Sequence, residues 1–108
     1  MTNLCVFADR TDVVWQVTGD LDIVGARALR SVSTWLPDPG RRLRVDIGDV
    51  PFMDCSGLSA LIDLSRQART RDVDVVITGA RRQVLRLLTV TETEDLLTVL
   101  PADESSVA

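Results

Sequence analysis

Histidine and lysine are absent from this chain of 108 residues. Ser56 and Cys55 could each act as a nucleophile, but neither has a histidine or lysine to serve as its base. The absence of lysine also excludes a Walker-type phosphate loop and a Schiff base. Glycine-rich nucleotide fingerprints are missing as well. The sequence therefore predicts a protein that is not an enzyme and that holds no cofactor.

Cysteine and positive charge are also scarce. The chain has 2 cysteines, Cys5 and Cys55, and we expect both to be free thiols in a cytosolic protein. Without histidine, a zinc site would need thiols and carboxylates together, and no ligand spacing of that kind occurs. The 16 acidic residues outnumber the 12 basic ones, and the resulting net charge of -4 argues against a nucleic-acid partner.

The chain has neither a long apolar run nor a secretory signal. Residues 1–6 lack a cationic stretch followed by an apolar one, and no apolar run approaches the length of a membrane span. We therefore expect a cytoplasmic protein with no membrane partner. Its 108 residues predict a single domain over residues 1–100, followed by a flexible polar tail at 101–108.

The apolar patterns that are present predict an α/β fold. Alternating or short apolar runs indicate strands at 4–8, 13–17, 43–47, 73–77 and 96–100. Helical spacing indicates helices between Asp22 and Pro37, over 57–69 and over 81–88. The order β-β-α-β-α-β-α-β gives a mixed sheet with helices packed against it, and the strand, helix, strand succession predicts a right-handed parallel crossover.

The first helix can be described in more detail. Asp22 is suited to be its N-terminal cap, and the prolines and glycine of residues 37–40 are suited to end it. Its core-facing apolar stripe is predicted to comprise Val24, Ala28, Val32, Trp35 and Leu36.

The segment from Asp49 to Leu58 sets a hydroxyl between a strand end and a helix start. Ser56 is predicted at a helix N-terminus, where unpaired backbone N–H groups and the helix dipole favour an oxygen or an added anion. Ser56 could therefore be a switch that accepts a phosphate. On the local pattern alone, a plain cap supplied by Ser56 or Asp54 is the more typical interpretation.

Two motifs carry a resemblance to a known family. Asp54-Cys55-Ser56-Gly57-Leu58 resembles the Asp-Ser-Ser-Gly-Leu signature of the anti-sigma factor antagonists, the bacterial proteins that define the STAS domain. Gly19-Asp20-Leu21-Asp22 resembles the Gly-Glu-Leu-Asp that precedes the first helix in the same family. Residues 75–79 and 84–88 extend the resemblance over nearly the whole chain, and it implies a STAS fold with the phosphate-accepting position on Ser56.

The sequence departs from the family pattern in two places. Cys55 stands where the commonest motif has its first serine, so that position offers no second hydroxyl. Pro101 opens a polar tail where many family members continue into a last helix. The second departure affects any partner contact that the family makes through its last helix. It does not change the acceptor position at Ser56.

The resemblance implies a phosphorylation switch. Unmodified protein would bind an anti-sigma factor, itself an ATP-dependent serine kinase, and so free a sigma factor for transcription. That kinase would phosphorylate Ser56 and end the binding, and a serine phosphatase would restore it. Residues expected to contribute to recognition by the kinase partner lie in the two motifs and on the polar face of the following helix: Asp20, Asp22, Asp54, Cys55, Gly57, Asp63 and Arg66.

Other interpretations of these residues stay open at this point. Asp20, Asp22 and Asp54 could cluster to bind a divalent ion, although two of them are suited to capping helices. The polar helix face that includes Asp63 and Arg66 could be ordinary solvated surface. The whole chain could also be a STAS scaffold, or an accessory subunit of a signalling complex or a lipid or anion transport system, with no link to a sigma factor.

Overall fold

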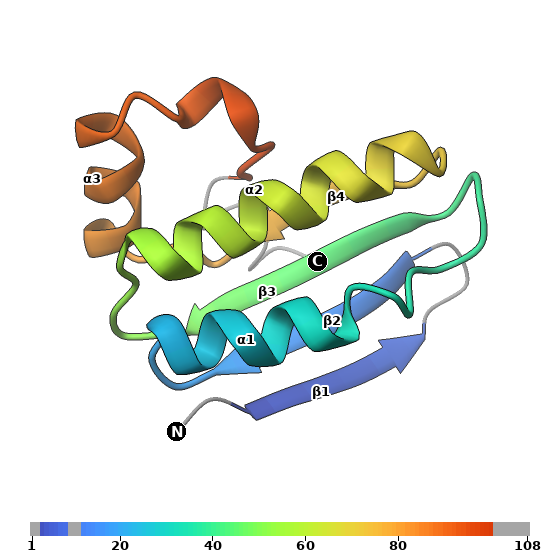
Figure 1. The fold of residues 1–108 in the computed structure, drawn as a ribbon, viewed down its shortest axis with the longest axis horizontal. Helices are drawn as coiled ribbons and strands as arrows, with labels where there is room; N and C mark the ends of the chain where they lie inside the picture. Colours follow the sequence, from blue (N-terminus) through green and yellow to red (C-terminus); the bar gives the residue numbers. More distant parts are fainter. Residues whose placement is uncertain (1–2, 9–11, 101–108) are drawn as a thin grey trace.

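A sheet of four strands organises the computed structural model, which describes residues 3–8 and 12–100 (Figure 1). The strands lie in chain order and are β1 (Asn3–Ala8), β2 (Asp12–Thr18), β3 (Arg42–Asp49) and β4 (Asp74–Thr78). β1 runs antiparallel to β2, whereas β3 runs parallel to both β2 and β4. The predicted mixed sheet and its parallel crossover are confirmed. The polar tail predicted at 101–108 lies outside the described residues.

Two helices cover one face of this sheet. α1 (Ile23–Val32) and α2 (Cys55–Thr70) lie side by side on it, and α3 (Arg82–Val90) stands at the end of the sheet near the start of α2 (Figure 1). Trp15, Val45 and Ile77, which come from three different strands, are at most 1% exposed and form one layer of the core. Leu61 and Leu64 of α2 close that core from the helix side.

The core-facing stripe predicted for α1 is wrong in part, because three of its five residues are exposed. Val24 and Trp35 are 63% and 77% exposed, whereas Gly25, Ala26 and Leu29 are the buried residues. The buried stripe is built from small side chains, which let the helix axis approach its neighbours closely. Ala28 is exposed too, while Val32 and Leu36 pack against the core in part.

α1 also ends earlier than predicted, at Val32 rather than at the prolines of residues 37–40. The Ser33 hydroxyl donates to the Arg30 carbonyl over 2.7 Å, and the Ser31 hydroxyl donates to the Ala28 carbonyl over 2.8 Å. Such hydroxyls offer the backbone carbonyls an alternative partner, which weakens the last helical turn. The serines therefore end the helix before the prolines are reached.

The fifth strand predicted at 96–100 is wrong. Residues Glu94–Leu96 form a short 3-10 helix, and the strand is reduced to one parallel bridge between Val99 and Ile77. The Ile77 N–H donates to Thr98 O over 2.8 Å, and the Leu100 N–H donates to Ile77 O over 2.9 Å. These two bonds attach the chain to the outer side of β4 without extending the sheet.

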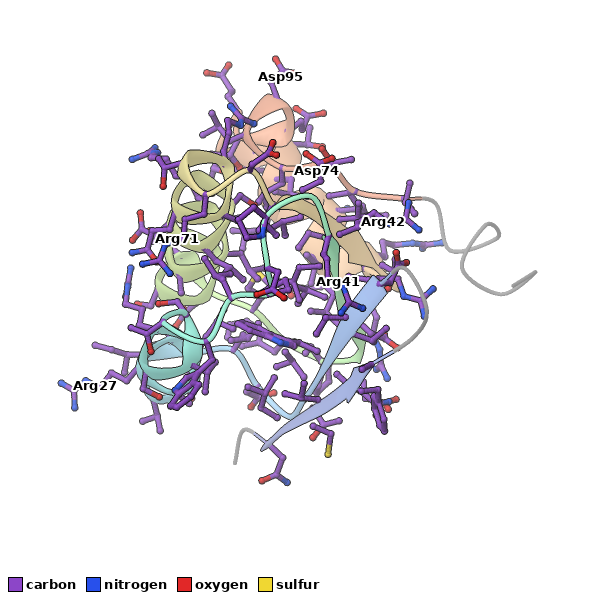
Figure 2. All side chains as sticks on the ribbon, turned by 90° about the vertical axis from the view of Figure 1, so that its right-hand side faces the viewer. Arg27, Arg41, Arg42, Arg71, Asp74 and Asp95 are labelled. Carbon is purple, nitrogen blue, oxygen red and sulfur yellow. The ribbon has the colours of Figure 1, made fainter. Side chains whose placement is uncertain are left out.

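The amino ends of the strands are held by a charged pair. Arg42 donates to both carboxylate oxygens of Asp12, with the shortest distance, 2.7 Å, from Nη2 to Oδ2. This hydrogen bond and the charge of Asp12 raise the pKa of the Arg42 guanidinium above its ordinary value. Arg42 also lies opposite Asp74 in the register of β3 and β4, and Figure 2 shows both at this end of the sheet. The opposite, carboxyl ends of the strands are where the two motifs meet.

Candidate functional site

The loops after β2 and β3 are joined through one backbone position, Leu21. Leu21 and Met53 form a parallel bridge outside the named strands. The Leu21 N–H donates to Phe52 O over 2.9 Å, and Leu21 O accepts from the Asp54 N–H over 3.3 Å. Because β2 and β3 are parallel, their carboxyl ends lie at the same edge of the sheet, and Leu21 links the two motifs there.

Each motif supplies the N-terminal cap of a helix. Asp22 Oδ1 accepts from the N–H groups of Val24 and Gly25, both over 3.1 Å, at the start of α1. Asp54 Oδ1 accepts from the Ser56 N–H over 2.8 Å and from the Gly57 N–H over 3.1 Å, at the start of α2. A capping carboxylate is stabilised by these otherwise unpaired donors and by the helix dipole. The predicted cap at Asp22 is confirmed, and at α2 the cap is Asp54 rather than Ser56.

This capping arrangement determines where Ser56 lies. α2 begins at Cys55, two residues earlier than predicted, so Ser56 is in the first helical turn. Its backbone N–H is used by Asp54, and its side chain takes no part in the cap. Ser56 is partly exposed, Cys55 is exposed and Gly57 is buried. Apart from the capping Asp54, the first turn of α2 contains no acidic side chain.

Gly57 is held tightly against the first motif. A Cβ at this position would lie in severe overlap with the Leu21 carbonyl oxygen and only 2.8 Å from Leu21 Cβ. No real side chain shows contacts this short, so only glycine fits without movement of one loop. The glycine of one motif and the leucine of the other therefore form a single packed unit beneath Ser56.

Gln83 on α3 supports the same loop and was not found from the sequence. Its amide makes two hydrogen bonds with the backbone of Met53, accepting the N–H over 2.9 Å and donating to the carbonyl over 2.8 Å. Arg81 adds a bond from Nε to Gly48 O, at 2.9 Å. A glutamine near a helix start is an ordinary surface pattern, and nothing in the sequence signals a partner 30 residues away.

The remaining predicted recognition residues are only partly brought together. Asp20 is exposed in the loop that contains Leu21. Asp63 and Arg66 lie further along α2, roughly 10 to 15 Å from Ser56 at about 1.5 Å of helix rise per residue. Asp63 accepts a hydrogen bond from Arg30 of α1 over 2.9 Å, and both side chains are nearly half exposed. An exposed pair of this kind contributes little to stability.

Metal-ligand groups and membrane-spanning helices are not found in the part of the chain that the structure describes. Within residues 3–8 and 12–100, no group of three or more cysteine, aspartate or glutamate side chains is placed to hold a metal ion. None of the helices in those ranges is long and apolar enough to cross a membrane. Cys5 and Cys55 are both exposed and free, as predicted.

Comparison with known protein families identifies the family to which this chain belongs. The family model described as "Mlab, STAS domain" matches residues 6–99. The chain belongs to the STAS domain family. The resemblance drawn from the two motifs is thereby confirmed at the level of the family.

Individual relatives of this STAS domain agree with that assignment. An anti-sigma-B factor antagonist from Bacillus subtilis (strain 168) is 23% identical to it over 105 residues, covering 97% of this chain and 96% of the relative. The crystal structure of an anti-sigma factor antagonist from Mycobacterium paratuberculosis matches with a TM-score of 0.77 at 16% identity, over 99% of this chain and 92% of that one. The STAS domain of a SulP transporter from Vibrio cholerae matches with a TM-score of 0.71 at 23% identity, over 94% and 81%.

Replacing Gln83 with glutamate should destabilise this STAS domain by about 1 to 2 kcal/mol at pH 7. The new carboxylate can accept from the Met53 N–H but cannot donate to the Met53 carbonyl, which it would repel. When protonated, the new carboxyl can donate again, so its pKa in the folded state rises above the unfolded value of about 4.3. The lost stability should therefore return at a pH below both values and be absent above them.

Urea unfolding of Gln83→Glu and of the unsubstituted protein at pH 4 and pH 7 would measure this difference. Gln67→Glu is the matched control because Gln67 is exposed on α2, where the same substitution should change stability by less than about 0.5 kcal/mol. A Gln83→Glu variant as stable as this control at pH 7 would show that the two bonds to Met53 do not support the loop.

Proposed function

We propose that this protein is an anti-sigma factor antagonist whose binding is switched by phosphorylation of Ser56. In its unmodified form it binds an anti-sigma factor that is also a serine kinase, and a sigma factor is released. The kinase transfers phosphate from ATP to Ser56 and the complex dissociates, after which a serine phosphatase restores the unmodified form. We place this exchange in the cytoplasm, and the antagonist itself supplies no catalysis.

The observation that carries the proposal is the division of roles between Asp54 and Ser56. Asp54 caps α2 with Oδ1, so the Ser56 hydroxyl is not needed to begin the helix. A phosphate on Ser56 would therefore leave the side-chain hydrogen bonds that begin α2 in place. The antagonists among the relatives support the same role, since one covers nearly the full length of this chain.

The two motifs would present Ser56 to the kinase as a rigid unit. Leu21 and Gln83 fix the loop before α2 from both sides, so the acceptor oxygen has a defined position relative to Asp54 and Cys55. Positioning of reacting groups is a large part of phosphoryl transfer, because the protein contributes little covalent chemistry to that step. The kinase would recognise the carboxylates of Asp20 and Asp54 together with the Ser56 hydroxyl.

Ser56→Ala should abolish phosphate incorporation by the kinase that binds the unmodified protein. Incubation with that kinase and labelled ATP, followed by mass measurement of the intact chain, gives the stoichiometry directly. Ser59→Ala is the matched control, since Ser59 is exposed in the same helix and should leave one phosphate per chain. Full labelling of Ser56→Ala would disprove the assignment of the acceptor.

A second candidate function is an accessory STAS subunit of a transport or signalling complex. The fold shared with the SulP transporter domain supports it, although a shared fold says nothing about activity. Affinity purification from native cells would separate the two candidates. Recovery of a membrane transporter with Ser56 unmodified, and of no kinase, would favour the accessory subunit.

A further inference from the structure

The outer edge of β1 has none of the features that normally prevent strand pairing. β1 is at the end of the sheet, and in the described parts of the chain only β2 pairs with it. Its six residues, Asn3–Ala8, include no charged residue and no proline. Val6 and Phe7 are 60% and 53% exposed. Edge strands in monomeric proteins are usually protected by charges, prolines or bulges, so β1 is open to another strand.

α1 presents exposed apolar side chains toward the same side of the molecule. Arg30 pairs with Asp63 and so marks the side of α1 that faces α2. At about 100° per residue, Val24 and Ala28 lie roughly 120° and 160° around the helix from Arg30. Figure 1 shows α1 lying between α2 and β1, so this side of the helix is the β1 side. Arg27 projects away from the sheet into solvent instead (Figure 2).

We propose that β1 pairs antiparallel with β1 of a second copy about a two-fold axis perpendicular to the sheet. The dimer would have one continuous sheet with both α1 helices on the same face. A two-fold interface places each residue near its own symmetry mate, so a charged strand would repel itself. This chain has a net charge of -4, and β1 is a strand without any charge, which makes it suited to self-pairing.

The direction of the side chains limits the register to two alternatives. Leu4 and Val6 lie opposite Val17 and Trp15, which are each 1% exposed, so the even-numbered side chains of β1 face the helices. A two-fold axis perpendicular to the sheet keeps each side chain on its own face, and paired residues share a face. If five residues of each strand overlap, the axis passes through the pair formed by Cys5 and its mate, or by Val6 and its mate.

The helices of such a dimer would not collide. α1 lies over β2 in Figure 1, and three strand spacings would separate β2 from its mate, about 14 Å in total. Packed helices lie about 8 to 10 Å apart, so α1 and its mate fit on this face of the sheet without a clash. Ser56 lies in the first turn of α2, which packs on the other side of α1, so the dimer leaves the proposed phosphorylation site open.

Sedimentation of the full chain under reducing conditions, from micromolar to millimolar concentration, tests the proposal. We expect a monomer–dimer equilibrium whose dissociation constant rises at least about tenfold in Val6→Glu, because Val6 lies at the axis or next to it in both registers and the two carboxylates would repel each other there. Val90→Glu is the matched control, since Val90 is 74% exposed on α3, away from β1. A monomer at every concentration, or equal weakening by both substitutions, would overturn the proposal.

Mild oxidation tests the register independently. Facing residues in antiparallel strands have Cα atoms about 4.5 to 5.5 Å apart, within the range of a disulfide. With the axis at Cys5, the Cys55→Ser variant forms a disulfide dimer. With the axis at Val6, the dimer forms instead in a variant that combines Cys5→Ser, Val6→Cys and Cys55→Ser. Cross-linking of one variant alone supports the dimer, and cross-linking of neither or of both contradicts it.

Discussion

Gly57→Ala is expected to destabilise the domain by at least about 3 kcal/mol, which is a large fraction of the stability of a small domain. Alanine is the better helix former by about 1 kcal/mol, so helix propensity alone predicts the opposite sign. Packing decides the outcome, because a Cβ at residue 57 would overlap the Leu21 carbonyl oxygen. The Cβ would be fixed to the backbone of α2 and the Leu21 oxygen belongs to the backbone of the neighbouring loop, so neither atom can move aside as the end of a flexible side chain could.

Relief of that overlap would have to separate the two motifs. Movement of Leu21 would strain its bonds to Phe52 and Asp54, and movement of α2 would disturb the cap at Asp54. Loss of one or two buried backbone hydrogen bonds, together with overpacking, accounts for a cost of about 3 to 5 kcal/mol.

Urea unfolding followed by circular dichroism measures this cost. Gly40→Ala is the control, since a Cβ there has no atom within 4 Å and meets only the strain of a φ of +86°. That strain costs about 1 to 2 kcal/mol. If Gly57→Ala were no less stable than Gly40→Ala, the close approach of the two motifs would not be important for folding.

Phosphorylation of Ser56 is expected to lower the affinity for the kinase partner at least about tenfold, which corresponds to about 1.4 kcal/mol. The phosphate adds about 1.5 to 2 negative charges. A partner carboxylate about 6 Å away, at an effective dielectric of about 40, would be repelled by roughly 2 to 3 kcal/mol. Titration calorimetry of the two forms against a kinase that cannot hydrolyse ATP would measure the difference, and equal affinities would exclude the switch.

The free domain should keep its structure when it is phosphorylated. The phosphate would lie at the N-terminus of α2, where the helix dipole favours an anion and offsets part of the repulsion from Asp54. Amide NMR shifts should therefore be confined to residues 54–61 and 19–22. Shifts that spread through β2 and β4 would indicate a change of conformation instead.

The sequence predicts the elements of this fold better than it predicts how they face one another. The apolar patterns of the first four strands and the cap at Asp22 are local features, and the structure agrees with both. The rotation of α1 is not local: two apolar stripes run along this helix, and the one containing Gly25 and Ala26 is inside because small residues fit there. Val24 and Trp35, the larger residues, are left in solvent.

For the candidate site, too, the sequence predicts the local features but not the contacts between elements. The motif places Ser56 at a helix start, and a family resemblance marks it as the acceptor position. Only three-dimensional contacts show that Asp54 is the cap, that Gly57 packs on Leu21 and that α3 holds the loop through Gln83. The bonds from Gln83 are to backbone atoms of Met53, so no pattern of side chains along the chain could reveal them.

The two bonds between Gln83 and Met53 also have a consequence for synthesis on the ribosome. The signature around Ser56 emerges first, and its support on α3 follows 30 residues later. A nascent chain that has not yet delivered Gln83 carries the signature without one of the contacts that position it. Under the proposed switch, recognition by the kinase would therefore require synthesis past Gln83, and products truncated between Ser56 and Gln83 would compete poorly for the partner.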